Sequence, residues 1–356
     1  MAKKIDHEIS ELYQMIAADI ARMPAGSRVP SYAGCMKKYN CSRRVLEYVF
    51  QRLAAEGKLE IVPRQGAYVS RKTAETCRVI LVHTDWPQEY QAHLNKYFIA
   101  ELATLPGVTV AKCLVPPVPT VDDFCSALSP ANGDIGIVCC NFHHFSQQDA
   151  ARLLNCGIPL IFTENHMVCR AVNLIDSMPE YTGMLAADYL YKRGHRKIAL
   201  VNSDAIDSCL RREIDGFLCY LALQGVQVEM IDCRHPACES SLASAEEKGL
   251  SYLKKNGMNF TAAFLSSPFA ARGFCNALNQ LGYSVPEDVS IIANSEVPSA
   301  AKHVPPLTTI SRDFAGYAST AKKMVKMLRS GKHPGIIPVP SFIVERQSVR
   351  DISKKQ

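Results

Sequence analysis

The sequence lacks long hydrophobic runs. No apolar stretch among its 356 residues approaches the roughly 18 residues that a membrane-spanning helix needs. The basic start of the chain, residues 1–6, has no apolar core behind it, which argues against a signal peptide. We therefore expect a cytoplasmic protein that has no membrane partner.

The sequence also lacks the common catalytic motifs. It contains no Gly-x-Ser-x-Gly, no phosphate-binding loop and no Rossmann glycine fingerprint, which argues against an enzyme. His143 and His144 follow an apolar run that reads as a strand. Because no nucleophile or metal partner lies near them in the sequence, a pair of loop residues is the preferred interpretation.

Metal-binding spacings are missing as well. None of the 14 cysteines forms a Cys-x-x-Cys pair, so the pattern of a zinc ribbon is absent. The nearest approach to a ligand cluster is the segment that contains Cys233, His235 and Cys238. Free, reduced thiols in a reducing compartment are the better interpretation. We expect no metal and no cofactor.

The positive charge of the chain is concentrated near its N-terminus. Residues 1–75 hold 13 lysines and arginines against 8 acidic residues, whereas the other 281 residues hold 27 against 26. A small basic module on a nearly neutral body is typical of a part that binds a polyanion. Charge alone does not decide this, because a short basic segment can also be simply solvated.

The first 70 residues have the pattern of a winged helix-turn-helix. Apolar residues at helical spacing predict a helix over 6–22, and Ser31 and Ser42 stand where they can cap helices over 32–39 and 43–56. Two short alternating runs around Leu59 and Val69 then flank a hairpin tip. We expect a recognition helix that begins at Arg43, followed by a wing.

A recognition helix inserts its N-terminal residues into the major groove of DNA. Arginine at that end can form a bidentate pair with guanine, helix-capping serines place backbone amides near phosphate, and a hairpin tip can reach the backbone or the minor groove. Alternatively, the two arginines are only solvated at the end of the helix and do not contact DNA. The candidate DNA-binding residues are Ser31, Ser42, Arg43, Arg44, Arg64, Gln65 and Gly66.

Four phrases in this region, residues 24–31, 42–44, 52–59 and 64–69, resemble the DNA-binding domain of the gluconate-repressor (GntR) family. The resemblance implies that Arg43 contacts a base. The sequence departs from the family after Ser31, where one expected arginine is missing, at Glu47, which replaces another arginine, and at Pro63, which replaces a wing glycine. The operator sequence therefore cannot be taken from the family.

Beyond a polar linker over 71–77, residues 78–350 alternate apolar strand runs with amphipathic helices. The alternation predicts parallel sheets covered by helices on both faces, which bind ligands beyond the carboxyl ends of their strands. The length is sufficient for two lobes with a cleft between them. We expect an α/β fold in which a winged helix-turn-helix over 1–70 precedes a two-lobed, periplasmic-binding-protein-like domain.

Four further phrases, residues 157–162, 190–199, 281–291 and 305–310, resemble the effector domain of the lactose/galactose-repressor (LacI/GalR) family. Combined with the N-terminal module, the architecture is similar to that of the arabinose-repressor subgroup. The resemblance implies a carbohydrate-responsive repressor that forms a homodimer, binds double-stranded DNA at a near-palindromic operator, and binds a small-molecule effector, possibly a sugar, between its lobes.

The positions where that family holds its effector carry other residues here. Glu213 stands where the family places an arginine, and the family's paired aspartates fall at Ser295 and Glu296. Sugar sites also need an aromatic platform, for which Trp86 and Tyr90 are candidates, although ordinary packing is an equal alternative for Trp86. The candidate effector-binding residues are Asp85, Trp86, Tyr90, Glu164, Asn165, Arg212, Glu213, Ser267, Ser295 and Glu296.

The altered positions leave two hypotheses for the large domain. The site either binds an unusual ligand or has lost ligand control, which would make the protein a ligand-independent regulator. A sugar-binding transport protein is a more distant alternative, because it would need a signal peptide and would not need residues 8–70.

Overall fold

The computed structural model describes residues 2–21, 23–24, 26–55, 58–63, 65–69, 76–85, 89–139, 145–164, 173–235 and 240–353. The chain divides into two compact units, Met1–Thr76 and Cys77–Gln356. Most of the expected linker lies outside the described residues, and Cys77 already begins a strand. Among the helices of the described ranges, none is long and apolar enough to cross a membrane.

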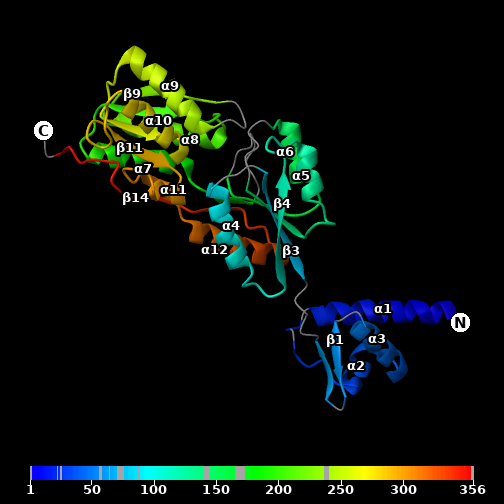
Figure 1. The fold of residues 1–356 in the computed structure, drawn as a ribbon. Coiled ribbons are helices and arrows are strands. Elements are labelled where there is room, and N and C mark those ends of the chain that lie inside the picture. Colours follow the sequence, from blue (N-terminus) through cyan, green and yellow to red (C-terminus); the bar gives the residue numbers. More distant parts are fainter. Residues whose placement is uncertain are drawn as a thin grey trace. The chain divides into compact units, whose positions relative to one another are not determined.

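The N-terminal unit consists of three helices and a two-stranded hairpin, as expected for a winged helix (Figure 1). The hairpin is antiparallel, and the segment around Arg28 adds a short bridge to it at Tyr68. Val29 donates its backbone N–H to Ala67, which ties this segment to the wing. The elements are α1 (Ala2–Ala21), α2 (Tyr32–Tyr39), α3 (Arg43–Ala55), β1 (Leu59–Val62) and β2 (Gly66–Val69).

The core of this unit is formed by the apolar stripe of each helix and by the inward residues of the wing. Leu46, Val49, Phe50 and Leu53 of α3 are fully buried. Asn40 adopts a left-handed conformation after α2, which closes the tight turn between α2 and α3. Glu56, the expected last residue of this helix, lies outside the described residues.

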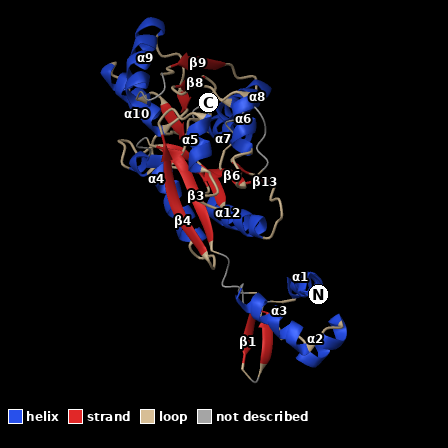
Figure 2. Cartoon of the chain, turned by 90° about the vertical axis from the view of Figure 1, so that its right-hand side faces the viewer, coloured by secondary structure: helices blue, strands red, loops and turns tan. Residues whose placement is uncertain are grey.

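The first lobe of the large unit is built on a six-stranded parallel sheet with the strand order β13-β7-β6-β5-β3-β4. Helices α4 and α12 share a buried cluster on one face, and α5 and α6 share a cluster on the other. Figure 2 shows the long neighbouring strands β3 and β4. The elements are β3 (Cys77–Thr84), α4 (Glu89–Leu102), β4 (Val108–Val115), α5 (Val121–Ala127), β5 (Ile135–Val138), α6 (Gln147–Leu154), β6 (Leu160–Phe162), β7 (Leu174–Asp176), α12 (Phe314–Arg329) and β13 (Ile336–Pro338).

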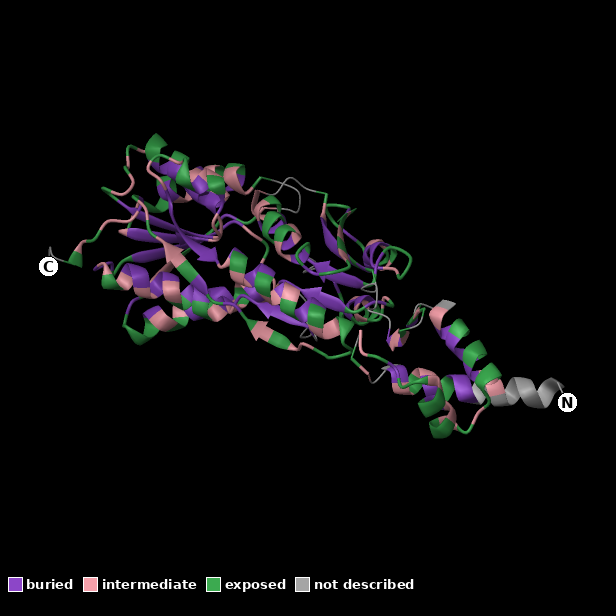
Figure 3. Ribbon diagram, turned by 90° about the horizontal axis from the view of Figure 1, so that it is seen from below, coloured by how far each residue is buried: buried purple, intermediate pink, exposed green. Residues whose placement is uncertain are grey.

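The second lobe repeats this plan with the strand order β14-β12-β11-β10-β8-β9, in which only the edge strand β14 is antiparallel. Helices α7 and α8 cover one face, and α9 and α10 cover the other. Buried strands lie between the helix layers in Figure 3. The elements are α7 (Pro179–Lys192), β8 (Ile198–Asn202), α8 (Ser208–Leu223), β9 (Val228–Asp232), α9 (Ser241–Asn256), β10 (Ala262–Leu265), α10 (Pro268–Gln280), β11 (Ser290–Asn294), α11 (Pro298–Ala301), β12 (Thr308–Arg312) and β14 (Ser341–Val344).

The chain passes between the lobes three times: from β7 to α7, from β12 to α12, and from β13 to β14. This topology places the end of β12, and hence Arg312, where the two lobes meet. The expected alternation of strands and helices over 78–293 is confirmed. The sequence pattern did not predict α5, α11, α12 or the strands β12, β13 and β14.

Two glycines allow α7 and α8 to cross at close range. A Cβ atom on Gly183 would lie 1.9 Å from the carbonyl oxygen of Glu213, and one on Gly216 would lie 2.2 Å from that of Glu180. Any side chain at these positions would therefore collide with backbone. The close crossing fixes the first turns of α8, which carry the side chains discussed below.

Candidate DNA-binding surface and effector site

The N-terminus of α3 presents two exposed arginines, Arg43 and Arg44. Ser42 caps this end, since its Oγ accepts the N–H of Val45 at 3.4 Å. Arg43 reaches one turn along the helix, where its Nε lies 2.9 Å from Oε1 of Glu47. Because the Arg43 side chain remains 73% exposed, this ion pair is weak and can open when a stronger acceptor arrives.

The other candidate DNA-binding residues are also on the surface, where they are described. Ser31 caps α2 by accepting the N–H of Gly34 at 3.3 Å, and its side chain is exposed. At the tip of the wing, Gln65 is exposed and Gly66 has a φ of 113°, which favours glycine. Arg64 lies outside the described residues.

In the large unit, a buried ion pair joins the two lobes. Arg312, the last residue of β12, places its Nε 2.6 Å from Oε1 of Glu164, which follows β6. Both side chains are largely buried. Arg312 also donates to Oγ of Ser295 at 3.0 Å and lies 5.4 Å from the ring of Tyr90. A second link joins the lobes where Glu89 of α4 accepts the N–H and the hydroxyl of Ser299.

Glu213 on α8 is the most unusual group near this pair. It is only 3% exposed, and its Oε2 accepts the amide of Asn294 at 2.7 Å. Its Oε1 has no hydrogen-bond partner among the residues that the structure describes. Burial raises the pKa of Glu213 to about 8, an effect that Arg312 partly offsets and that Glu164 strengthens. The carboxyl therefore carries its proton at neutral pH.

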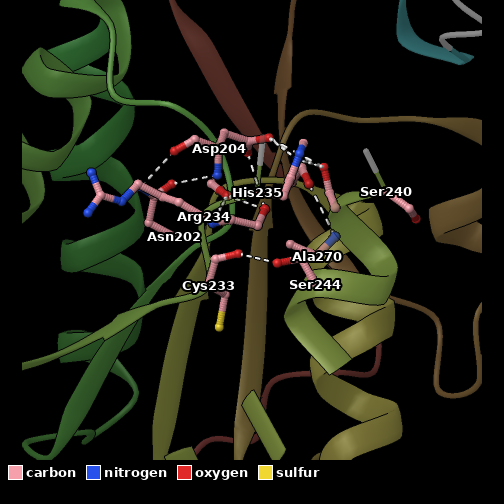
Figure 4. Close-up of polar contacts among 12 residues, drawn as sticks. Asn202, Asp204, Cys233, Arg234, His235, Ser240, Ser244 and Ala270 are labelled. Atoms are coloured by element: carbon pink, nitrogen blue, oxygen red, sulfur yellow. Dashed lines mark hydrogen bonds and ion pairs between the residues drawn. The ribbon is translucent and has the colours of Figure 1, made fainter. Parts of the chain in front are cut away.

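A polar cluster lies at the carboxyl ends of β8, β9 and β10 (Figure 4). Ser241 shares its hydroxyl between Nε2 of His235 at 2.9 Å and Oδ1 of Asp204 at 3.4 Å. Ser203 and Ser266 contact each other at 3.1 Å beside them. Both Ser241 and Asp204 contact the same imidazole nitrogen, so the three residues do not form the relay of a serine hydrolase.

Several predicted effector residues are occupied by other contacts. Arg212 forms a bidentate pair with Glu180 of α7 at 2.5 and 2.8 Å. Glu296 pairs with Arg346 at 2.6 Å. Both arrangements connect elements within the second lobe, and the assignment of Arg212 and Glu296 to the effector site stays a prediction.

The remaining predicted effector residues differ in their surroundings. Ser267 caps α10 by accepting the N–H of Ala270 at 3.2 Å. Asp85 follows β3 and is exposed. Tyr90 packs against Phe314 with ring centroids 5.5 Å apart. Trp86 and Asn165 lie outside the described residues. The structure thus brings together Tyr90, Glu164, Glu213 and Ser295.

Three residues of this site were missed from the sequence: Arg312, Asn294 and Asp204. Each stands at or directly after the carboxyl end of a strand, which is where such sheets bind ligands. Asn294 and Asp204 follow runs that were already predicted as strands, so the rule could have found them. Arg312 follows residues 305–310, which resemble the LacI/GalR family but were not predicted to form a strand.

The structure allows no metal assignment at residues 233–238. No group of three or more potential metal ligands occurs among the described residues. Cys238 and its neighbours from 236 to 239 lie outside them. Cys233 is buried, and burial raises the pKa of its thiol to about 11. A thiol in that state is a poor nucleophile and a poor metal ligand.

Comparison with known proteins places this geometry in context. Residues 187–349 match the family model of the periplasmic binding protein-like domain. The HTH-type transcriptional repressor PurR of Vibrio cholerae serotype O1 is 28% identical over 188 residues, which are 52% of this chain and 54% of that protein. The chain thus spans about half the length of the curated relative it matches.

Solved structures agree with the fold over a longer stretch. A dimeric Lac repressor with an 11-residue C-terminal deletion superposes with a TM-score of 0.67 at 20% identity, covering 77% of this chain and 98% of that one. A LacI-family regulator from Enterococcus faecium with bound ribose gives 0.63 at 18% identity, covering 78% and 100%. The chain therefore shares the two-lobed fold of these regulators, and its residues 187–349 are similar to the periplasmic binding protein-like domain.

Proposed function

We propose that the protein is a sequence-specific DNA-binding transcription regulator, acting as a repressor, whose operator affinity depends on a small molecule bound between the lobes. The observation that carries the proposal is the exposed, basic N-terminus of α3 in a winged helix, attached to the fold of ligand-sensing repressors. The relatives are repressors and not enzymes, in agreement with the missing catalytic motifs.

We propose that the N-terminal unit is a DNA-binding domain of the gluconate-repressor (GntR) type, because residues 8–70 resemble that family. Arg43 and Arg44 enter the major groove, and the wing around Gln65 contacts the backbone. The Lac repressor with an 11-residue C-terminal deletion, to which the chain is similar, is dimeric. We therefore propose a homodimer whose two heads read the half-sites of a near-palindrome.

A salt titration tests whether the chain binds DNA as proposed. Fluorescence anisotropy of a labelled duplex should give an affinity that falls steeply with salt, with a log–log slope of roughly −4 to −8, as expected for several phosphate contacts. A slope near zero would contradict DNA binding through the basic N-terminal unit. A steep slope would indicate this unit, because the nearly neutral large unit cannot supply several phosphate contacts alone.

Replacing Glu47 with glutamine should strengthen DNA binding about 2- to 5-fold. The change removes a negative charge near the proposed phosphate contacts and releases Arg43 from its ion pair. The measurement is the dissociation constant at fixed salt. Glu60→Gln, which makes the same charge change on β1 of the wing, serves as the matched control. If Glu47→Gln binds DNA with unchanged or weaker affinity, Arg43 does not contact DNA from the N-terminus of α3.

A ligand-independent regulator is the second candidate, and one observation favours it. The ion pair between Arg312 and Glu164 joins the lobes through side chains of the protein itself, as does the pair of contacts between Glu89 and Ser299. In this case the operator affinity would be the same with every small molecule tested. The ligand-controlled candidate is preferred because Glu213 keeps an open hydrogen-bonding position beside the pair.

A further inference from the structure

Resting on the proposed ligand-controlled function, we propose that the inter-lobe site binds a small cation, a molecule that carries a protonated primary amine, and that Glu213 receives this amine. The starting point is Oε1 of Glu213, a buried carboxylate oxygen that lacks a hydrogen-bond partner among the described residues. A ligand that fills the site must satisfy this atom, because a buried polar group without a partner is costly.

The surroundings of Glu213 favour a positive ligand. Among the described residues, the cation that acts on Glu213 is Arg312, which is already engaged by Glu164 and Ser295. The other charged groups that act on Glu213 are acidic and come from the end of β6 and from the loop before α8. The ionisable groups that face Glu213 are Arg312 of β12, Glu164 after β6, Asp204 and Asp207 before α8, and Cys209 of α8.

The alternative ligands fit less well. An anion would meet these carboxylates with no uncommitted cation among the described residues to receive it. A neutral sugar can donate a hydroxyl to Oε1, but it brings no positive charge to balance the acidic groups around Glu213. An ammonium group supplies three donors and a charge, which matches both the open Oε1 and the acidic surroundings.

Binding by this route releases a proton. In the empty site the carboxyl of Glu213 is protonated at neutral pH, because burial raises its pKa to about 8. An arriving ammonium group keeps its own proton and displaces the carboxyl proton into water, leaving an ammonium–carboxylate pair. The affinity for an amine should therefore rise with pH up to about 8, whereas a neutral acceptor bonded to the protonated carboxyl should bind more weakly as pH rises.

Matched pairs of amine and neutral molecules test the inference by calorimetry on the full chain. The pairs, whose amines stay protonated at pH 8, are ethanolamine with ethylene glycol, cadaverine with 1,5-pentanediol, and putrescine with 1,4-butanediol. At least one amine should bind at pH 8 about tenfold or more tightly than its neutral partner, and about tenfold more weakly at pH 6.5 than at pH 8. Its binding heat should change between phosphate and HEPES buffers, neither of which contains a primary amine, because a proton is released.

Two variants separate the role of Glu213 from general charge effects. Glu213→Gln should abolish the preference for the amine and its pH dependence. Asp215→Asn makes the same change at an exposed position on α8 and should alter neither. If no amine binds above its neutral partner, or if affinity rises as pH falls, the inference is wrong. Operator binding without ligand decides the proposed function separately.

Discussion

Glu213→Gln is expected to stabilise the protein by about 1–3 kcal/mol at pH 7. The native state must bury the carboxyl of Glu213 in its protonated form, and burial raises its pKa from 4.5 to about 8. Glutamine has the same shape and accepts the amide of Asn294 through its own oxygen, but it does not ionise. Chemical denaturation of the two proteins in the absence of ligand measures the difference.

The sign of the pH dependence follows from the same shift. Because the pKa of Glu213 is higher in the folded state, the folded state binds more protons between about pH 4.5 and pH 8. Glu213 therefore makes the native protein lose stability as pH rises through this window, and the loss levels off above about pH 8. The stability gained by Glu213→Gln should be small near pH 4.5 and largest near pH 8.

The exposed neighbour Asp215 gives the control for this prediction. Asp215→Asn should change the free energy of unfolding by less than about 0.5 kcal/mol, since surface substitutions rarely do more. A destabilised Glu213→Gln at pH 7, or a difference that is constant from pH 5 to pH 8, would mean that the carboxyl of Glu213 is ionised and well satisfied in the native protein. The inferred amine site would then lose its support.

Arg43→Ala is expected to weaken binding to the operator roughly 10- to 100-fold, which is the usual loss for a bidentate base contact. The side chain is exposed and makes only a weak pair with Glu47, so its removal should leave the thermal stability of the protein unchanged. The dissociation constants for operator and random duplex, measured at one salt concentration, give the loss of specificity.

Arg43→Lys separates specific reading from charge. Lysine keeps the positive charge but not the planar fork of donors that matches guanine. It should retain binding to random duplex and the salt slope, while losing most of the preference for the operator. If Arg43→Ala and the unaltered protein show equal specificity for the operator, Arg43 is not part of the recognition surface. The assignment of α3 as the recognition helix would then be unsupported.

Local signals in the sequence were sufficient for the elements of the N-terminal unit and for most elements of residues 78–293, but not for α5, α11, α12, β12, β13 and β14. The caps at Ser31 and Ser42 depend on neighbouring residues only, so a short window contains the information. Periodicity likewise identified β6 and β11, which end beside the site, because fully buried parallel strands are continuous apolar runs.

The contacts of the effector site could not be derived in this way, because they depend on distant residues. Arg212 and Glu213 are adjacent in sequence, yet the helical turn of about 100° per residue directs the first to Glu180 and the second toward Asn294. Glu296 pairs with Arg346, which follows β14 and is 50 residues away in the sequence. Only the folded chain shows which acidic residues remain open to a ligand.

Selection from random DNA tests the central claim most directly. Full-length protein is incubated with a pool of random duplexes, and bound sequences are recovered and counted over several rounds. We expect that a single near-palindromic sequence is enriched, and that the same rounds with Arg43→Ala yield no such sequence. A pool that stays random with the unaltered protein, or the same enrichment with Arg43→Ala, would contradict the claim that the α3 surface reads an operator.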